Sequence, residues 1–179
     1  MKHLLLVALL LAGAGAVPAS AQRHIKHISS WGALLGRSEQ GRYYELSYTS
    51  MLTNRLALRA GVLRETGSLA GRGDYTGYTG RVLLAPQLFR VGEVAYVHLL
   101  LGAAAAYERT GENGPVELPP DAQQPQRFTY GPQAGAEADV FLGNRVSLVA
   151  TATKGYLFNN PLLDQWPGYA GAGLRYHFR

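Results

Sequence analysis

The segment FTYGPQAGAEADVFL, residues 128–142, decides the fold because its apolar and polar residues alternate over most of its length. The polar parity carries Gln133, Gly135, Glu137 and Asp139. The other parity is apolar throughout, with Phe128, Tyr130, Ala134, Ala136, Ala138, Val140 and Leu142. Successive side chains of a β-strand point to opposite faces, so this pattern predicts a strand with one apolar and one polar face.

The same alternation recurs along the chain and predicts an all-β protein of about eight antiparallel strands. In 168–178, for example, Leu174, Tyr176 and Phe178 alternate with Arg175 and His177. The short segment 29–36 has the weakest pattern, and a lead-in segment is its alternative. The expected strands cover 29–36, 42–51, 55–65, 75–88, 94–107, 128–142, 145–156 and 168–178.

The connections between these segments alternate between short and long. The short ones are Met51–Asn54, Arg90–Glu93 and Gly143–Asn144, and the long ones are 66–74, 108–127 and 157–167. Up-and-down transmembrane barrels have short periplasmic turns and longer outer loops, so the layout favours that class. A soluble lipocalin-like barrel that binds a small ligand is the alternative.

The start of the chain indicates export. Residues 1–21 combine a basic start at Lys2, an apolar run from Leu4 to Val17 and the sequence Ala19-Ser20-Ala21, which is typical of a cleaved signal peptide. A retained membrane helix is the alternative, but that run is shorter than the roughly 20 residues a bilayer requires. We therefore expect a signal peptide at 1–21, an N-terminal lead-in at 22–28 and an outer-membrane β-barrel domain at 29–179 of a Gram-negative bacterium.

Composition narrows the function classes. The chain has no Cys, so neither disulfides nor thiolate metal sites are expected. Without the signal, 16 Lys and Arg face 12 Asp and Glu, because only Lys2 of the 17 lies within 1–21, and the net charge is +4. The excess is small and scattered, so we expect no direct nucleic-acid binding.

The inward parity of the predicted barrel carries charges of both signs. Unpaired burial of such groups is very costly, so we expect them to form a paired network that fills the lumen. A proton or ion path is the functional alternative to this structural role. The expected network consists of Glu45, Arg59, Arg81, Glu137, Asp139 and Arg175.

Aromatic residues fall on the apolar parity, mostly near strand ends. Transmembrane barrels carry aromatic girdles at both membrane interfaces, although aromatics also favour strands in general. The expected girdle residues are Tyr44, Tyr48, Tyr107, Tyr130, Tyr156, Tyr176 and Phe178.

The sequence gives little support for a catalytic site or a metal-binding site. His98 and His177 are the histidines on the inward parity of strands, and no Gly-x-Ser-x-Gly or His-x-Ser element accompanies them. His24 and His27 are three residues apart near the mature start, and two ligands do not make a metal site. We expect a non-enzymatic protein with no catalytic residues, no cofactor and no metal.

The last 50 residues or so resemble a known family. The matching features are Phe128-x-Tyr130-Gly131, Gly135-x-Glu137, Leu142-x-Asn144-Arg145, Lys154 and Gly171-x-Gly173-Leu174-Arg175-x-x-Phe178, together with Ala21-Gln22-Arg23. In these features the chain resembles the conjugal transfer protein TraO of Bacteroidetes conjugative transposons. Several of them recur in many small barrels, and Arg179 follows Phe178 where an aromatic residue usually ends the chain.

The resemblance implies an accessory component of a conjugative transfer apparatus, with outer-membrane lipid and other proteins of that apparatus as partners. Two alternatives remain open. One is a generic small outer-membrane barrel for envelope integrity or adhesion, and the other is a lipid-active barrel enzyme. The oligomeric state also stays open.

Overall fold

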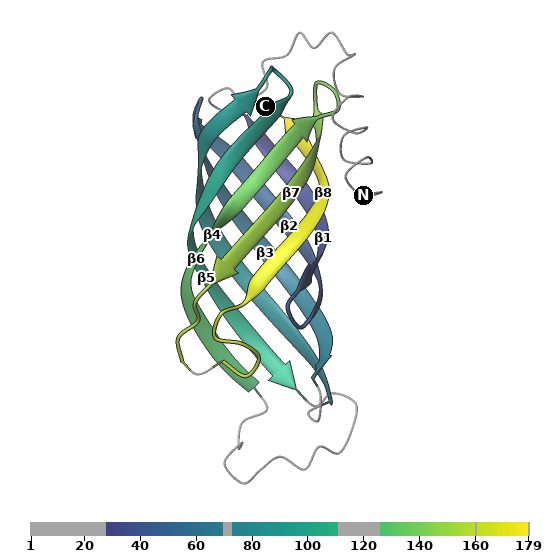
Figure 1. Ribbon diagram of the computed structural model, residues 1–179, viewed down its shortest axis with the longest axis vertical. Helices are drawn as coiled ribbons and strands as arrows, with labels where there is room; N and C mark the ends of the chain where they lie inside the picture. Colours follow the sequence, from purple (N-terminus) through teal and green to yellow (C-terminus); the bar gives the residue numbers. More distant parts are fainter. Residues whose placement is uncertain (1–27, 70–72, 111–125, 160, 179) are drawn as a thin grey trace, which may run out of the picture.

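A computed structural model describes residues 28–69, 73–110, 126–159 and 161–178. The expected signal peptide, and all of the expected lead-in except Ile28, lie outside these residues. Eight β-strands account for most of the described residues (Figure 1). They are β1 (Ser29–Ser38), β2 (Gly41–Thr53), β3 (Leu56–Leu69), β4 (Gly73–Val91), β5 (Ala95–Thr110), β6 (Gln126–Phe141), β7 (Val146–Gly155) and β8 (Gly168–Phe178).

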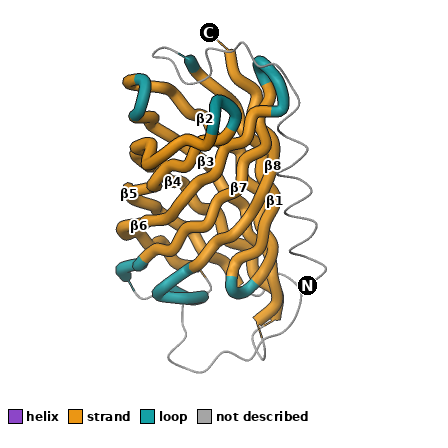
Figure 2. The backbone as a smooth tube through the Cα atoms, turned by 45° about the horizontal axis from the view of Figure 1, so that its top comes forward, coloured by secondary structure: helices purple, strands orange, loops and turns teal. Residues whose placement is uncertain are grey.

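The strands form one closed antiparallel barrel in which each pairs with its neighbour in sequence and β1 pairs with β8. The predicted up-and-down barrel of about eight strands is therefore confirmed. Following paired residues once around the barrel from Phe178 leads back to β8 at Gly168, a displacement of ten residues. Such a shear requires strongly tilted strands, which Figures 1 and 2 show.

The segment with the weakest pattern is a full strand. Residues 29–38 pair along their length with both β2 and β8, and this pairing closes the barrel. Closure removes the free edges that β1 and β8 would have in an open sheet. The lead-in alternative for 29–36 was therefore wrong.

Two of the expected long loops were also misplaced. Most of 66–74 belongs to β3 and β4, whose pairing continues to Leu69 and Gly73, and residues 108–110 and 126–127 belong to β5 and β6. The strands continue there with polar residues on both faces, so the hydropathy alternation ends before the hydrogen bonding does. The described residues of 157–167 do connect β7 and β8 without a regular strand, apart from an isolated bridge between Tyr130 and Phe158.

The two ends of the barrel differ. We call the end with Ser29, Phe178 and the turns 54–55, 92–94 and 142–145 the terminal end, at the top of Figure 1. The other is the loop end, where the long hairpin arms of β3–β4 and β5–β6 extend beyond the shorter β1, β7 and β8. The loop end also has one tight turn, at residues 39–40 between β1 and β2.

The charges predicted for the inward parity are buried, and most large apolar residues of the outward parity are exposed, although apolar residues such as Leu83 and Leu100 also face inward. On β7 the burial alternates without exception, and Ser147, Val149, Thr151 and Thr153 point inward. No helix among the described residues is long and apolar enough to cross a membrane.

Candidate functional site

Six charged side chains form one continuous chain of ion pairs inside the barrel, which we call the lumen network. It consists of the six residues that the sequence placed on the inward parity, and all of them are at most 3% exposed. The chain alternates in sign, in the order Arg81, Glu45, Arg59, Glu137, Arg175 and Asp139.

Arg59 on β3 lies at the middle of the lumen network. Its Nη2 donates to Glu45 Oε1 on β2 at 2.9 Å, and its Nη1 donates to Glu137 on β6. Arg81 on β4 also binds Glu45, with Nε 3.0 Å from Oε1. One carboxylate is thus shared by two guanidinium groups.

Arg175 on β8 binds two carboxylates of β6. Its Nη1 lies 2.8 Å from Glu137 Oε1 and 2.8 Å from Asp139 Oδ2, and its Nη2 lies 2.8 Å from Glu137 Oε2. Bidentate arginine–carboxylate pairs fix geometry as well as charge. Three arginines and three acids cancel, so the lumen network has no net charge.

Apolar side chains close the lumen beside this network at the terminal end. A buried cluster there consists of Ile28, Met51, Ala57, Leu83, Ala85 and Leu100. Eight-stranded barrels are narrow enough for side chains to fill most of the interior. Among the described residues, a small pocket remains beside this cluster, and His98, Glu137, Arg175 and His177 also line it. The arrangement can hold strands together across the lumen.

The two strand histidines are buried in the lumen, at 2% exposure for His98 and 7% for His177. Sequence motifs gave no serine partner, but the fold brings Ser147 Oγ within 2.9 Å of His177 Nε2. The His177 ring also stacks on Phe141, with centroids 4.7 Å apart. Because Ser147 is fully buried, this serine–histidine pair is closed to a lipid substrate.

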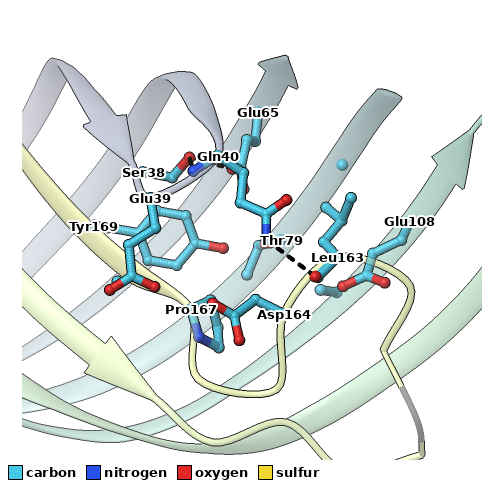
Figure 3. A pocket seen from close by; sticks show the side chains of 13 residues that line it. Ser38, Glu39, Gln40, Glu65, Thr79, Glu108, Leu163, Asp164, Pro167 and Tyr169 are labelled. Atoms are coloured by element: carbon cyan, nitrogen blue, oxygen red, sulfur yellow. Dashed lines mark hydrogen bonds between the residues drawn. The ribbon is translucent and has the colours of Figure 1, made fainter. Parts of the chain in front are cut away.

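The loop end of the lumen holds a small polar pocket (Figure 3). The β7–β8 connection folds over it, since Gln40 Nε2 donates to Leu163 O at 3.0 Å and Leu162 N donates to Glu108 Oε2 at 2.6 Å. Beneath it, the Glu65 carboxylate accepts hydrogen bonds from Ser38 Oγ and from Tyr75 Oη, the latter at 2.8 Å. The Glu65 carboxylate is thus hydrogen-bonded to strand residues of the barrel, and the Glu108 carboxylate to the β7–β8 connection.

The sequence analysis missed this pocket. The predicted loop 108–127 includes Glu108, and the predicted strands give Tyr75 and Tyr169 no particular role. Their burial had a signal, because Tyr75 and Tyr169 lie on the inward parity of their predicted strands, and Glu108 does so once the predicted strand 94–107 is extended to the true end of β5.

The expected girdle residues lie on the outer surface in two groups. Tyr176 and Phe178 lie at the terminal end of β8, and Tyr48 contacts Trp31 on β1, with ring centroids 5.2 Å apart. Tyr44, Tyr107, Tyr130 and Tyr156 lie toward the loop end. The sequence analysis left out Trp31, Tyr78, Phe128, Phe158 and Trp166, which extend the two groups and are each 46–55% exposed.

Within the described part of the chain, no cluster of three or more His, Asp and Glu side chains is arranged to hold a metal ion. His24 and His27 lie outside the described residues.

Solved structures similar to this chain include small bacterial outer-membrane barrels. The N-terminal β-barrel domain of Pseudomonas aeruginosa OprF matches with a TM-score of 0.64 at 14% identity, covering 86% of this chain and 98% of that one. A major outer membrane protein from Thermus thermophilus matches with a TM-score of 0.66 at 14% identity, covering 84% and 99%. Ail, the attachment invasion locus protein of Yersinia pestis, matches with a TM-score of 0.56 at 17% identity, covering 86% and 100%.

The chain therefore has the fold of an eight-stranded outer-membrane β-barrel. No protein-family model matches the sequence, and no curated protein matches it.

Proposed function

We propose that the protein is a non-enzymatic barrel of the Gram-negative outer membrane that acts through its two ends rather than by transport. The observation that carries this proposal is the inverted distribution of side chains. Large apolar residues such as Leu35, Val62 and Leu174 are 54–63% exposed, whereas the six charges of the lumen network are buried. Continuous apolar surface of this extent is unfavourable in water and favourable in lipid.

The same distribution argues against the soluble lipocalin-like alternative. A soluble barrel that binds a small ligand needs a polar outside and an apolar cavity inside. Here the inside is occupied by the lumen network and the apolar cluster around Leu83 and Leu100. With the loop end outward, the short turns face the periplasm, as in other barrels of this class.

Cell fractionation tests the membrane proposal. The full chain, expressed with its own N-terminus in a Gram-negative host, is expected to sediment with outer membranes, to resist carbonate extraction and to migrate faster on a gel when it is not heated. The same protein in planar bilayers is expected to give no steady conductance, because the lumen network and the apolar cluster lie across the lumen. Recovery from the soluble periplasm would contradict the proposal.

At a finer level, we propose an accessory role in conjugative transfer. Its support is the resemblance of roughly the last 50 residues to TraO, which covers β6, β7 and β8. The matching residues include Glu137 and Arg175, whose ion pair could stabilise any eight-stranded barrel with charged residues in its lumen. A generic barrel for envelope integrity or adhesion is therefore the competing function. A lipid-active enzyme is disfavoured by the buried Ser147 and His177.

Deletion of the gene from its own host separates these two roles. The conjugation proposal predicts reduced transfer from the donor with unchanged permeability of the envelope to dyes and detergents. Transfer at the parental frequency, with the other transfer genes expressed, would favour the generic barrel. Restoration by the chain supplied from a plasmid is the control.

A further inference from the structure

Three exposed arginines gather on the outer surface of β1, β2 and β3 near the loop end. Arg37 and Arg42 lie directly opposite each other in the β1–β2 ladder, one residue from the turn at 39–40. Arg42 pairs with Thr66 across β2–β3, so Arg64 is its diagonal neighbour. Diagonal neighbours of this kind are about 7–8 Å apart, within the reach of arginine side chains.

Over the described ranges of the chain, this arrangement lacks an internal counter-charge. Like charges directly opposite each other across a strand pair are destabilising. Among the residues that the structure describes, no carboxylate forms an ion pair with Arg37, Arg42 or Arg64. Glu39, in the same turn, is bound instead by Lys154 Nζ at 2.8 Å. The patch therefore has three guanidinium groups available to an external anion.

The surface directly below the arginines is apolar. Toward the terminal end follow Leu35, Leu46 and Val62, which are 62%, 51% and 63% exposed. Tyr44 lies opposite Arg64, and the Arg64 guanidinium lies 6.0 Å from the centre of the Tyr78 ring. From the loop end toward the terminal end, this surface carries cations, then tyrosines, then aliphatic side chains. This is the order in which a membrane leaflet presents charged headgroups, the interfacial region and acyl chains.

We propose that Arg37, Arg42 and Arg64 bind the phosphate of a phosphorylated glycolipid of the outer leaflet, whose acyl chains lie along Leu46 and Val62. Arginine suits phosphate because its planar group donates two parallel hydrogen bonds. The adjoining apolar surface selects a lipid over a free anion. The loop end is the end that would lie in the outer leaflet, where lipid A carries such phosphates.

Native mass spectrometry of the refolded full chain in detergent tests this site, using bisphosphorylated lipid A as the probe. We expect the wild type to bind it at least tenfold more tightly than dephosphorylated lipid A, and the triple variant R37Q/R42Q/R64Q to lose this preference. The matched control is R55Q/R90Q/R145Q, which removes three exposed arginines at the terminal end and should keep the preference. Heat-dependent gel migration verifies that each variant is folded.

Three results would overturn the proposal: equal binding of both lipids by the wild type, an unchanged preference in R37Q/R42Q/R64Q, or an affinity for inorganic phosphate equal to the affinity for lipid A. The last would mean that acyl contacts add nothing. Equally tight binding of a soluble sulfated oligosaccharide would assign the patch to a polyanion instead. The inference presupposes a membrane barrel, but binding is measured in detergent, so its failure is distinct from failure of the fractionation experiment.

Discussion

Arg59 on β3 and Glu137 on β6 form an ion pair across the lumen, between strands that share no backbone hydrogen bonds. Glu137 also holds Arg175 through both of its carboxylate oxygens. Replacing it by Gln would leave two buried guanidinium groups short of a counter-charge. Removal of one partner from a buried pair typically costs about 3–5 kcal/mol. We expect Glu137→Gln to lower the free energy of unfolding by that order, measured by urea titration in lipid vesicles.

Glu39→Gln is the matched control for that substitution. Glu39 makes a 2.8 Å ion pair with Lys154, but both side chains are about half exposed. Exposed pairs are screened by solvent and contribute little to stability. Equal losses in the two variants would show that the lumen network does not hold the barrel together.

The outward face of β6 should reject charge. Ala136 is exposed on that face, whereas Gln133 is 4% exposed and faces the lumen. An arginine facing lipid near the middle of the membrane costs about 2–4 kcal/mol. Ala136→Arg is therefore expected to reduce the heat-modifiable fraction of the protein in membranes, while Gln133→Ser leaves it close to wild type. The reverse ranking would refute the assigned facing of β6.

Gly36 is required by the close packing of a tyrosine ring. A Cβ at this position would clash with the backbone oxygen of Ala170 and lie 2.5 Å from Tyr43 Cε1. Tyr43 is buried and packs edge-on against Tyr169, with ring centroids 5.5 Å apart. The ring has little room to move, so we expect Gly36→Ala to cost about 1–3 kcal/mol, as overpacking does elsewhere. Gly80→Ala is the control, because nothing lies within 4 Å of its Cβ position. Thermal unfolding in detergent compares the two.

Residues 111–125 should be dispensable for assembly. The β5–β6 ladder extends to the pair Arg109 and Gln126, so a short turn in place of 111–125 leaves all of the described strand pairs intact. Removal of 108–127 should be worse, because it deletes Glu108, which binds Leu162 N at 2.6 Å. Proteolysis within 156–167 should increase in the larger deletion alone. Equal sensitivity in both deletions would show that Glu108 does not secure the β7–β8 connection.

The sequence predicts the barrel well because alternation between lipid-facing and lumen-facing residues is a local, period-two signal. It located the interior charges for the same reason, since parity assigns Arg59 or Glu137 to a face without any knowledge of partners. It did not reveal which acid binds which arginine, because those contacts join residues as far apart as 59 and 137. Nor did it locate the pocket around Glu65 and Glu108, where both faces of the strands carry polar residues and the alternation disappears.

A cysteine scan of β6 tests the central claim most directly, because the native chain contains no Cys. Single cysteines at 133–139, labelled with a fluorophore and exposed to a quencher dissolved in the lipid phase, report which side chains meet lipid. The structure predicts strong quenching at 134, 136 and 138 and weak quenching at 133, 135, 137 and 139, where side chains face the lumen. Uniformly weak quenching, or the opposite alternation, would contradict a barrel that exposes its apolar face to lipid.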